Sequence, residues 1–375
     1  MLHFLRFLYG EPDGWRIVFN LFRYVTFRSA GAAVTAFIFV LFVGPSWLAR
    51  LRAMKMLERT QKGDSAKLDE MHSSKATTPT MGGLLILAGA VGSALLWGKL
   101  VDWAGPKRGW YANWYLVGAI LTYAALAALG FVDDYRKLKL GKGLSMRSKL
   151  AAQAVIGVGV AAWLMYLGNP DVSTKLALPF TKYLPDLGVF FLVWALLVIM
   201  GSSNAVNITD GLDGLAAGCT FATAMTYGII AYVASHAKLA AYLYLPFVPG
   251  GEELAVFCAA CAGATLGFLW FNAHPAEVFM GDTGALPLGG AIGYCALAVK
   301  QEILLVLVGG VFVMEAMSVL IQIASFKLFG RRVFRIAPLH HHYQFAGWAE
   351  SKIVVRFWIM AAVFALLALA TLKVR

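Results

Sequence analysis

The sequence predicts an all-α, polytopic membrane protein with about ten transmembrane helices, built as a single integral-membrane domain over residues 1–375. Two observations predict this fold class. Of the 375 residues, 60% are hydrophobic and only 14% are charged, whereas soluble domains are about 45–50% apolar and about 25% charged. In addition, apolar runs of about 20 residues, the length that crosses a bilayer, recur along the whole chain.

Ten apolar runs are candidate spans, separated by short polar segments. In chain order they are Val25–Leu48, Met81–Leu100, Asn113–Val132, Leu150–Leu167, Leu187–Val206, Leu212–Ala234, Leu254–Phe271, Gly284–Val299, Ile303–Phe329 and Ile353–Leu372. The preceding segment, MLHFLRFLYGEPDGW, is expected to lie at the membrane interface, because a cleaved signal would need a longer apolar core. An even number of spans places both termini on one side of the membrane.

The positive charges predict which side that is. Of the 32 Lys and Arg residues, 18 lie in or beside the loops that follow the first, third and ninth predicted spans. Because cytoplasmic loops carry the excess of positive charge, we expect these loops in the cytoplasm and both termini in the periplasm. The net charge of +12 then reflects loops beside anionic lipid. No basic patch is interleaved with aromatic residues, so no nucleic-acid partner is expected.

Three aspartates are the most informative polar residues. Asp133 and Asp134 follow the third span in FVDDYRK, and Asp282 lies in FMGDTG before the eighth, which is expected to begin at Gly284. Carboxylates beside lipid are costly and therefore mark functional sites. Hard oxygen ligands of this kind suit Mg²⁺, which usually also takes substrate phosphates. The alternative is a set of interfacial charges solvated by lipid headgroups.

A second polar segment, NAVNITDGLDG, joins the fifth and sixth spans. It contains Asn207, Asp210, Gly211, Leu212 and Asp213 without a Lys or Arg to offset the two carboxylates. A cation or a donor-rich ligand from outside the segment is therefore expected. The alternative is a polar turn, although a helix cap would need only one or two of these side chains.

Two further loops carry polar groups on the same predicted side. HSSKATTPTMGG offers Lys75 and Thr80, with glycines that allow close approach of the backbone to a ligand. Asn272 and Phe279 precede Asp282 in the same segment, and Phe279 could stack on a base. The alternatives are a flexible basic loop and a simple turn between helices.

The C-terminal third contributes histidines and two intramembrane polar residues. His340, His341 and His342 stand in PLHHHYQ, and we expect a loop there because three adjacent side chains cannot share one helix face. The spacing does not match a usual zinc site. Glu315 and Gln322 lie seven residues apart on one face of the ninth span, where either function or buried packing would explain them.

Together, TPTMGG, DDYRK, NAVNITDGLDG, FMGDTG and PLHHH resemble the polyprenyl-phosphate N-acetylhexosamine-1-phosphate transferase superfamily, and most closely its phospho-N-acetylmuramoyl-pentapeptide transferases. The resemblance covers nearly the whole chain from His72 onward. Thr77 and Ala285 replace a glycine and a serine common at those positions, and neither change alters a charged group.

The resemblance implies a Mg²⁺-dependent reaction at the cytoplasmic face of a bacterial inner membrane. Undecaprenyl phosphate would attack UDP-N-acetylmuramoyl-pentapeptide, giving a diphosphate-linked lipid and UMP, and the assembly expected is a homodimer. The resemblance assigns metal and catalytic roles to Asp133, Asp134 and Asp282 and a catalytic role to His340, His341 and His342. It assigns substrate binding to Lys75, Thr80, Lys137, Lys149, Asn207, Asp210, Gly211, Leu212, Asp213, Asn272, Phe279 and Gln322.

Two other functions compete with this interpretation. A sister enzyme would transfer N-acetylglucosamine-1-phosphate to the same lipid, although PLHHHYQ and the spacing along the chain favour the muramoyl-pentapeptide donor. A transporter of an anion or a cation would need internal repeats and mid-membrane carboxylates. We find no repeat, and every polar motif falls after an odd-numbered span and hence on one predicted side.

Overall fold

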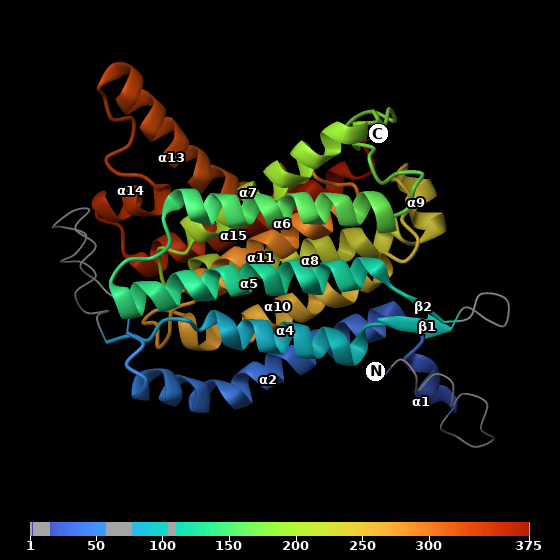
Figure 1. Ribbon diagram of the computed structural model, residues 1–375, viewed down its shortest axis with the longest axis horizontal. Helices are drawn as coiled ribbons and strands as arrows, with labels where there is room; N and C mark the ends of the chain where they lie inside the picture. Colours follow the sequence, from blue (N-terminus) through green and yellow to red (C-terminus); the bar gives the residue numbers. More distant parts are fainter. Residues whose placement is uncertain (1, 3–15, 58–76, 104–109, 375) are drawn as a thin grey trace.

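The computed structural model describes residues 2, 16–57, 77–103 and 110–374. Lys75, one of the expected substrate-binding residues, lies outside these ranges. Within them nearly all of the regular secondary structure is helical (Figure 1). The exceptions are two isolated bridges, one between Leu57 and Pro79 and one between Lys175 and Asp186, and a short antiparallel hairpin of β1 (Val101–Trp103) and β2 (Trp110–Ala112), which pairs Val101 with Ala112 and Trp103 with Trp110.

The helices follow the predicted spans in order. The first half contains α1 (Arg16–Leu21), α2 (Val25–Ala53), α4 (Gly83–Trp97), α5 (Trp114–Leu140), α6 (Met146–Leu167), the short 3-10 helix η3 (Gly188–Phe190) and α7 (Phe191–Thr209). The second half contains α8 (Leu215–Ala234), α9 (Ala237–Leu243), α10 (Glu252–Asn272), α11 (Asp282–Ala298), α12 (Leu305–Val308), α13 (Gly310–Phe329), α14 (Leu339–Phe345) and α15 (Glu350–Thr371).

The long helices form a bundle that fits a multi-pass membrane protein. Eight helices in the described part of the chain are long and apolar enough to cross a membrane. The other two predicted spans correspond to the shorter helices α4 and α11. Helix α11 packs between α5 and α7, α10 packs against α2, α4 and α8, and every residue of α11 is buried. The expectation of a polytopic all-α fold is confirmed.

Several boundaries differ from those predicted. Helix α5 continues two turns beyond Val132, so Asp133 and Asp134 lie on a helix rather than in a loop. Helix α11 begins at Asp282, two residues before the expected start. The ninth span is divided into α12 and α13 at Gly309. The histidines lie on α14, so the loop expected there is wrong.

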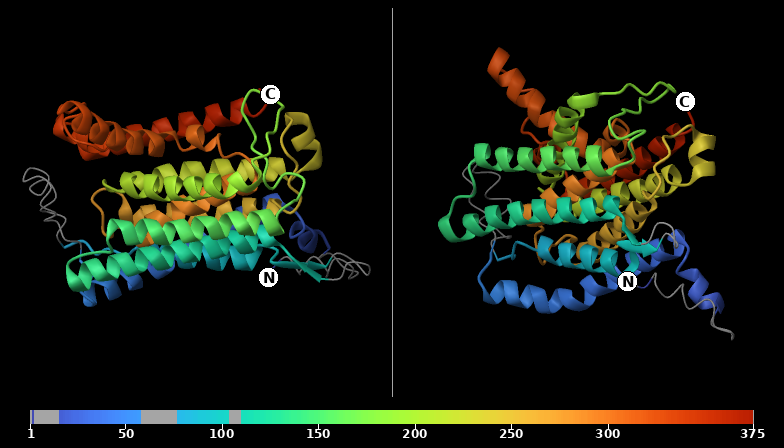
Figure 2. Two further views of the ribbon diagram at one scale, coloured as in Figure 1. Left: turned by 45° about the horizontal axis from the view of Figure 1, so that its top comes forward. Right: turned by 45° about the vertical axis from the view of Figure 1, so that its right-hand side comes forward.

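All the polar motifs that the structure describes lie at one end of the bundle, which we call the motif end. It is where α5, α7, α10 and α13 finish and where α11 and α15 begin, and α15 finishes at the other end (Figure 1). The C-terminal half of α13 leans away from the other helices (Figure 2), and Leu328 and Phe329 there are 74% and 72% exposed.

Close glycine contacts hold α11 in place at the motif end. A Cβ on Gly83 of α4 would stand 2.2 Å from the backbone nitrogen of Gly284, and a Cβ on Gly130 of α5 would stand 2.3 Å from the carbonyl oxygen of Asp282. Small residues of this kind let helix backbones approach in membranes. The contact at Gly130 brings the start of α11 against the turn of α5 that precedes Asp133 and Asp134.

A buried ion pair joins α2 and α10 near the opposite end. The guanidinium of Arg28 donates to both carboxylate oxygens of Glu253 at 2.7 Å, and the Glu253 side chain also accepts from the backbone N–H of Lys99 at 2.8 Å. Both charged side chains are fully enclosed. A buried carboxylate is tolerated only when it is paired in this way, so the pair fixes the contact between the two helices.

Candidate functional site

Asp133, Asp134 and Asp282 converge at the motif end. All three are buried, and one carboxylate oxygen from each lies within 4.8 Å of those of the other two. Asp133 and Asp134 are consecutive on α5, whereas Asp282 is the first residue of α11. Gly281 precedes it with φ +70°, and a Cβ there would stand 2.6 Å from Oδ2 of Asp134. Glycine is therefore needed at this position for two independent reasons.

Backbone and hydroxyl groups orient the two carboxylates of α5. Oδ2 of Asp134 accepts hydrogen bonds from the backbone N–H of Thr283 at 2.9 Å and from its hydroxyl at 2.7 Å. Oδ1 of Asp133 accepts from the backbone N–H of Leu144 at 2.6 Å. The first contact ties α5 to the start of α11, and the second ties it to the segment that leads into α6. Thr283 and Leu144 were not expected at the site.

Two lysines bring positive charge to the three carboxylates. Nζ of Lys137 lies 2.7 Å from Asp133, 2.8 Å from Asp282 and 3.6 Å from Asp134. Nζ of Lys149 lies 2.5 Å from Asp282 and 3.5 Å from Asp133. The Lys137 side chain is 46% exposed and that of Lys149 is 13% exposed. Three carboxylates and two ammonium groups leave one net negative charge, and the Lys137 side chain is the more exposed of the two lysine side chains.

The cluster fits a divalent cation. Its donors are all carboxylate oxygens, which are the ligands that Mg²⁺ prefers, and their mutual distances are close to those that one cation spans. Their burial limits competition from water. These residues can therefore hold a metal ion, with one net negative charge remaining to attract it.

A second group of polar residues surrounds Asp213, in the turn between α7 and α8. Oδ2 of Asp213 lies 3.0 Å from Nδ1 of His274 and accepts from the backbone N–H of Ala276 at 3.2 Å. The backbone N–H of Asp213 donates to Oε1 of Glu350 at 2.9 Å. Sequence reasoning missed His274 and Glu350, and the position of His274 two residues after Asn272 was the available signal.

Asn272 connects this turn to the loop before Asp282. Its side-chain oxygen accepts from the backbone N–H of Gly214 at 3.0 Å, and its side-chain nitrogen donates to the carbonyl of Val278 at 2.9 Å. The loop 273–281 thus runs from the Asp213 group to the three aspartates. Asn272 is buried, so it shapes the loop from its buried side.

Phe279 and Thr80 lie on adjoining segments. The backbone N–H of Phe279 donates to the carbonyl of Pro79 at 2.8 Å, and the carbonyl of Phe279 accepts from Gly82 at 2.9 Å. A Cβ on Gly281 would stand 3.1 Å from the hydroxyl oxygen of Thr80, so Thr80 also borders the aspartates. The Phe279 side chain is half-buried, and part of its surface can therefore meet a ligand.

The remaining residues of NAVNITDGLDG divide between a helix and a turn. Asn207 lies in the last turn of α7, and Asp210 caps that helix. Both are half-buried, as is Gly211, whereas Leu212 is buried and packs in the core. Asn207, Asp210 and Gly211 therefore retain surface at the motif end, but Leu212 does not.

The three histidines of α14 have different surroundings. His340 is fully buried against Glu315 of α13. Nδ1 of His341 lies 2.7 Å from Oε1 of Gln344, and Nδ1 of His342 accepts from the backbone N–H of Arg335 at 3.2 Å. His341 and His342 keep partial exposure. The burial of His340 favours a role in positioning other groups over direct contact with a substrate.

The side-chain amide of Gln322 is engaged by backbone groups of the segment that follows α13. Its side-chain oxygen accepts from the backbone N–H groups of Val333 and Phe334, each at 3.0 Å, and its side-chain nitrogen donates to the carbonyl of Phe334 at 3.0 Å. Gln322 therefore holds the segment that follows α13.

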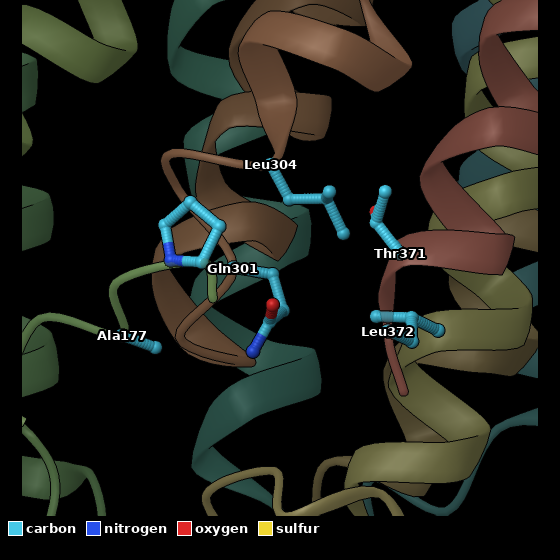
Figure 3. A pocket seen from close by; sticks show the side chains of 6 residues that line it. Ala177, Gln301, Leu304, Thr371 and Leu372 are labelled. Carbon is cyan, nitrogen blue, oxygen red and sulfur yellow. The ribbon is translucent and has the colours of Figure 1, made fainter. Parts of the chain in front are cut away.

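A small cavity lies at the opposite end of the bundle, away from these groups. Ala177, Pro179, Gln301, Leu304, Thr371 and Leu372 line it (Figure 3). Its volume of about 10 Å³ accommodates at most about one water molecule. It is too small to be a substrate site.

Sequence comparison finds relatives along nearly the whole chain. A family model described as glycosyl transferase family 4 matches residues 116–300. A phospho-N-acetylmuramoyl-pentapeptide-transferase from Citrifermentans bemidjiense is 50% identical over 373 residues, which cover 98% of this chain and 99% of that relative. A protein of the same name from Desulforapulum autotrophicum is 47% identical over 379 residues, covering 100% of both chains.

The chain belongs to the phospho-N-acetylmuramoyl-pentapeptide-transferase family. The part of the chain beyond residue 300 lies outside the glycosyl transferase family 4 match but inside the similarity to these named relatives. That part carries Glu315, Gln322 and the histidines of α14. Membership of the phospho-N-acetylmuramoyl-pentapeptide-transferase family therefore extends over both the aspartates and the C-terminal polar residues.

Proposed function

We propose that this member of the family transfers phospho-N-acetylmuramoyl-pentapeptide from its UDP conjugate to undecaprenyl phosphate, releasing UMP. The product would be a polyprenyl diphosphate that carries the muramoyl-pentapeptide. The observation that carries this proposal is the convergence of Asp133, Asp134 and Asp282 with Lys137 and Lys149 at one end of a membrane-spanning bundle. A site at the membrane surface reaches both a soluble donor and a lipid acceptor.

The reaction requires two anionic reactants to approach each other. Catalysis of phosphoryl transfer is therefore mainly positioning and charge neutralisation. Lys137 and Lys149 supply two ammonium groups at the site, and the partly exposed Lys137 can leave the carboxylates to meet a phosphate oxygen. Asp133 is our choice for the group that orients or deprotonates the acceptor phosphate, since Asp134 is held by both donors of Thr283.

We infer that Asp133, Asp134 and Asp282 hold Mg²⁺, with Asp282 as the principal ligand. Mg²⁺ would supply positive charge to the donor diphosphate. Asp282 is suited to this role because Gly281 lets the chain turn directly before it, and the hydrogen bonds from Thr283 keep Asp134 beside it.

The uridine of the donor is assigned to the surface between Asp213 and Phe279. Phe279 would stack on uracil, while Asp213 and Asn272 set the shape of the surrounding loop through the contacts with Ala276 and Val278. Asn207 and Asp210 would line the path of the sugar and diphosphate. Thr80 precedes α4 on the side that borders Phe279 and Gly281. Lys75 is proposed to bind the donor on the family resemblance alone. His341 and His342 are assigned to the sugar or diphosphate side.

The proposed location is the bacterial cytoplasmic membrane, with the motif end in the cytoplasm and a homodimer as the assembly. The positive charge of the loops at the motif end supports this orientation. The donor is soluble and the acceptor is lipid-anchored, so the cytoplasmic membrane surface is where they would meet.

The test is UMP release by the purified, detergent-solubilised protein. The assay contains UDP-N-acetylmuramoyl-pentapeptide, undecaprenyl phosphate and Mg²⁺, and each is omitted in turn, with EDTA as a further control. Release that requires all three supports the proposal. Release only with UDP-N-acetylglucosamine would move the protein to the sister activity, and no release with either donor would contradict the proposed transfer.

A further inference from the structure

Glu315 of α13 and His340 of α14 form a polar contact with no exposed surface. Both residues are 0% exposed. Oε1 of Glu315 accepts a hydrogen bond from the backbone N–H of His340 at 3.1 Å, and Oε2 lies 3.1 Å from Nδ1 of the His340 ring. Burying a carboxylate and an imidazole is costly unless they compensate each other, so this contact needs an explanation beyond packing.

The other ring nitrogen of His340 faces the turn that contains Asp210 and Asp213. A Cβ on Gly211 would stand only 2.2 Å from Nε2 of His340. Within the described part of the chain, neither nitrogen of this ring makes a hydrogen bond, so Nδ1 meets Oε2 of Glu315 only as a close contact. The imidazole therefore supports the backbone of Gly211 by direct contact, and Gly211 lies between the two carboxylates assigned to the donor.

Helix α13 holds the connecting segment at two points on one face. Gln322 binds the backbone of Val333 and Phe334, and Glu315 binds the backbone of His340. The two side chains are seven residues apart, which is two turns of a helix. The start of α14, and with it the ring of His340, is thus fixed relative to α13 rather than by its own short helix.

We propose that Glu315 is a positioning residue that acts through His340 to hold the Asp210–Asp213 turn in the geometry that donor binding requires. The inference rests on the proposed function for its ligand, the UDP-linked donor. In this proposal the buried His340 ring supports the backbone of Gly211. His341 and His342, which are partly exposed, have a different role. The three aspartates do not depend on this contact, because Thr283, Leu144 and the lysines orient them.

The first test is the kinetics of Glu315→Gln and Glu315→Asp. Glu315→Gln keeps the size of the side chain but removes its charge. We expect KM for the UDP donor to rise about tenfold while kcat and KM for undecaprenyl phosphate change less than about threefold. Glu315→Asp should recover part of the donor affinity. A fall in kcat at unchanged donor KM would overturn the proposal, because it would indicate a chemical role.

The matched control is Glu253→Gln. Glu253 is also a buried carboxylate, its partner is Arg28, and it lies about 30 Å from Asn272 along α10. We expect this variant to melt at a lower temperature while keeping its donor KM. If Glu253→Gln and Glu315→Gln raise the donor KM equally, the effect is general destabilisation and the positioning role is rejected.

A second test exploits the contact with Gly211. Gly211→Ala should weaken donor binding, because its new methyl group displaces the imidazole. His340→Ser removes the support and should weaken donor binding on its own, and in the double variant the two losses should add to less than their sum, because the methyl group no longer meets the ring. Unchanged donor binding in His340→Ser, or losses that simply add, would show that the turn does not depend on the His340 ring.

Hydrogen–deuterium exchange on the same variants separates this inference from the proposed function. Glu315→Gln should increase exchange in peptides covering residues 207–214 and 333–342, with no change in peptides covering 130–137. This readout does not need turnover, so it remains valid even if the wild-type protein releases no UMP. Unchanged exchange at 207–214 would overturn the inference.

Discussion

At the scale of single residues, the site depends on opposing charges in a small buried volume. Asp133, Asp134 and Asp282 share the ammonium groups of Lys137 and Lys149, and Thr283 fixes Asp134. Each carboxylate has a different set of partners, so none can substitute for another. The sequence predicted these five charged residues, but Thr283 carried no signal beyond its place next to Asp282.

Neutralising any one of the three aspartates is expected to abolish transfer. Asp133→Asn, Asp134→Asn and Asp282→Asn should each lower kcat by about a thousandfold or more, as for other charged groups in phosphoryl transfer. UMP release measures this effect, with Asp186→Asn as the control, because Asp186 is an exposed carboxylate away from the motif end. Near-normal turnover in Asp282→Asn would contradict the metal assignment.

Phe279 is expected to contribute to nucleotide affinity rather than to chemistry. Phe279→Ala should weaken UDP binding by about 1–3 kcal/mol, the range for a base stacked on an aromatic ring. Isothermal titration with UDP measures the change directly. Phe279→Trp retains a stacking surface and should bind nearly as well as the wild type, and an unchanged affinity in Phe279→Ala would remove the residue from the pocket.

At the scale of elements, sequence patterns did not predict the contacts that hold α14 and the segment before it. The rule that three adjacent side chains cannot share a helix face led to a loop at His340–His342. However, α14 is a short helix in which His340 is buried whereas His341 and His342 are half-buried, so its histidines lie in different environments. The partners of Gln322 and Glu315 are backbone groups more than ten residues away, and nothing in local periodicity reveals them.

Gly130 gives a test at this scale, because it sets the contact between α5 and α11. Gly130→Ala would place a methyl group 2.3 Å from the carbonyl oxygen of Asp282 and should separate Asp282 from the carboxylates of α5. We expect a loss of turnover and a destabilisation of about 1–3 kcal/mol. The control is Gly159→Ala on α6, where nothing lies within 4 Å of the new methyl group. If Gly130→Ala is as active as Gly159→Ala, the contact between α5 and α11 does not position Asp282.

At the scale of the whole molecule, hydropathy predicted most of the architecture. Every predicted span corresponds to a helix, because apolar length is a direct signal of a membrane crossing. The buried pair of Arg28 and Glu253 was not anticipated, since the two residues are far apart in the chain and each resembles an interfacial charge on its own. Packing partners of this kind require the folded structure.

The orientation of the bundle is testable by labelling in intact cells. All four native cysteines are buried, so the background reaction is expected to be low. Lys139→Cys adds an exposed thiol at the motif end, and Tyr183→Cys adds one at the opposite end, where Tyr183 is 68% exposed. A membrane-impermeant maleimide should label only the Tyr183→Cys protein from outside. Labelling of the Lys139→Cys protein alone would show that the motif end faces outward, opposite to the proposed orientation.

The most direct measurement for the central claim is the identity of the nucleotide that leaves the donor. Transfer of a phospho-sugar releases UMP and leaves two phosphates on the lipid, whereas transfer of the sugar alone would release UDP. We predict UMP in the aqueous phase and, by mass spectrometry, a polyprenyl diphosphate carrying the muramoyl-pentapeptide in the lipid phase, with neither formed by Asp282→Asn. Release of UDP with a lipid monophosphate product would contradict the account.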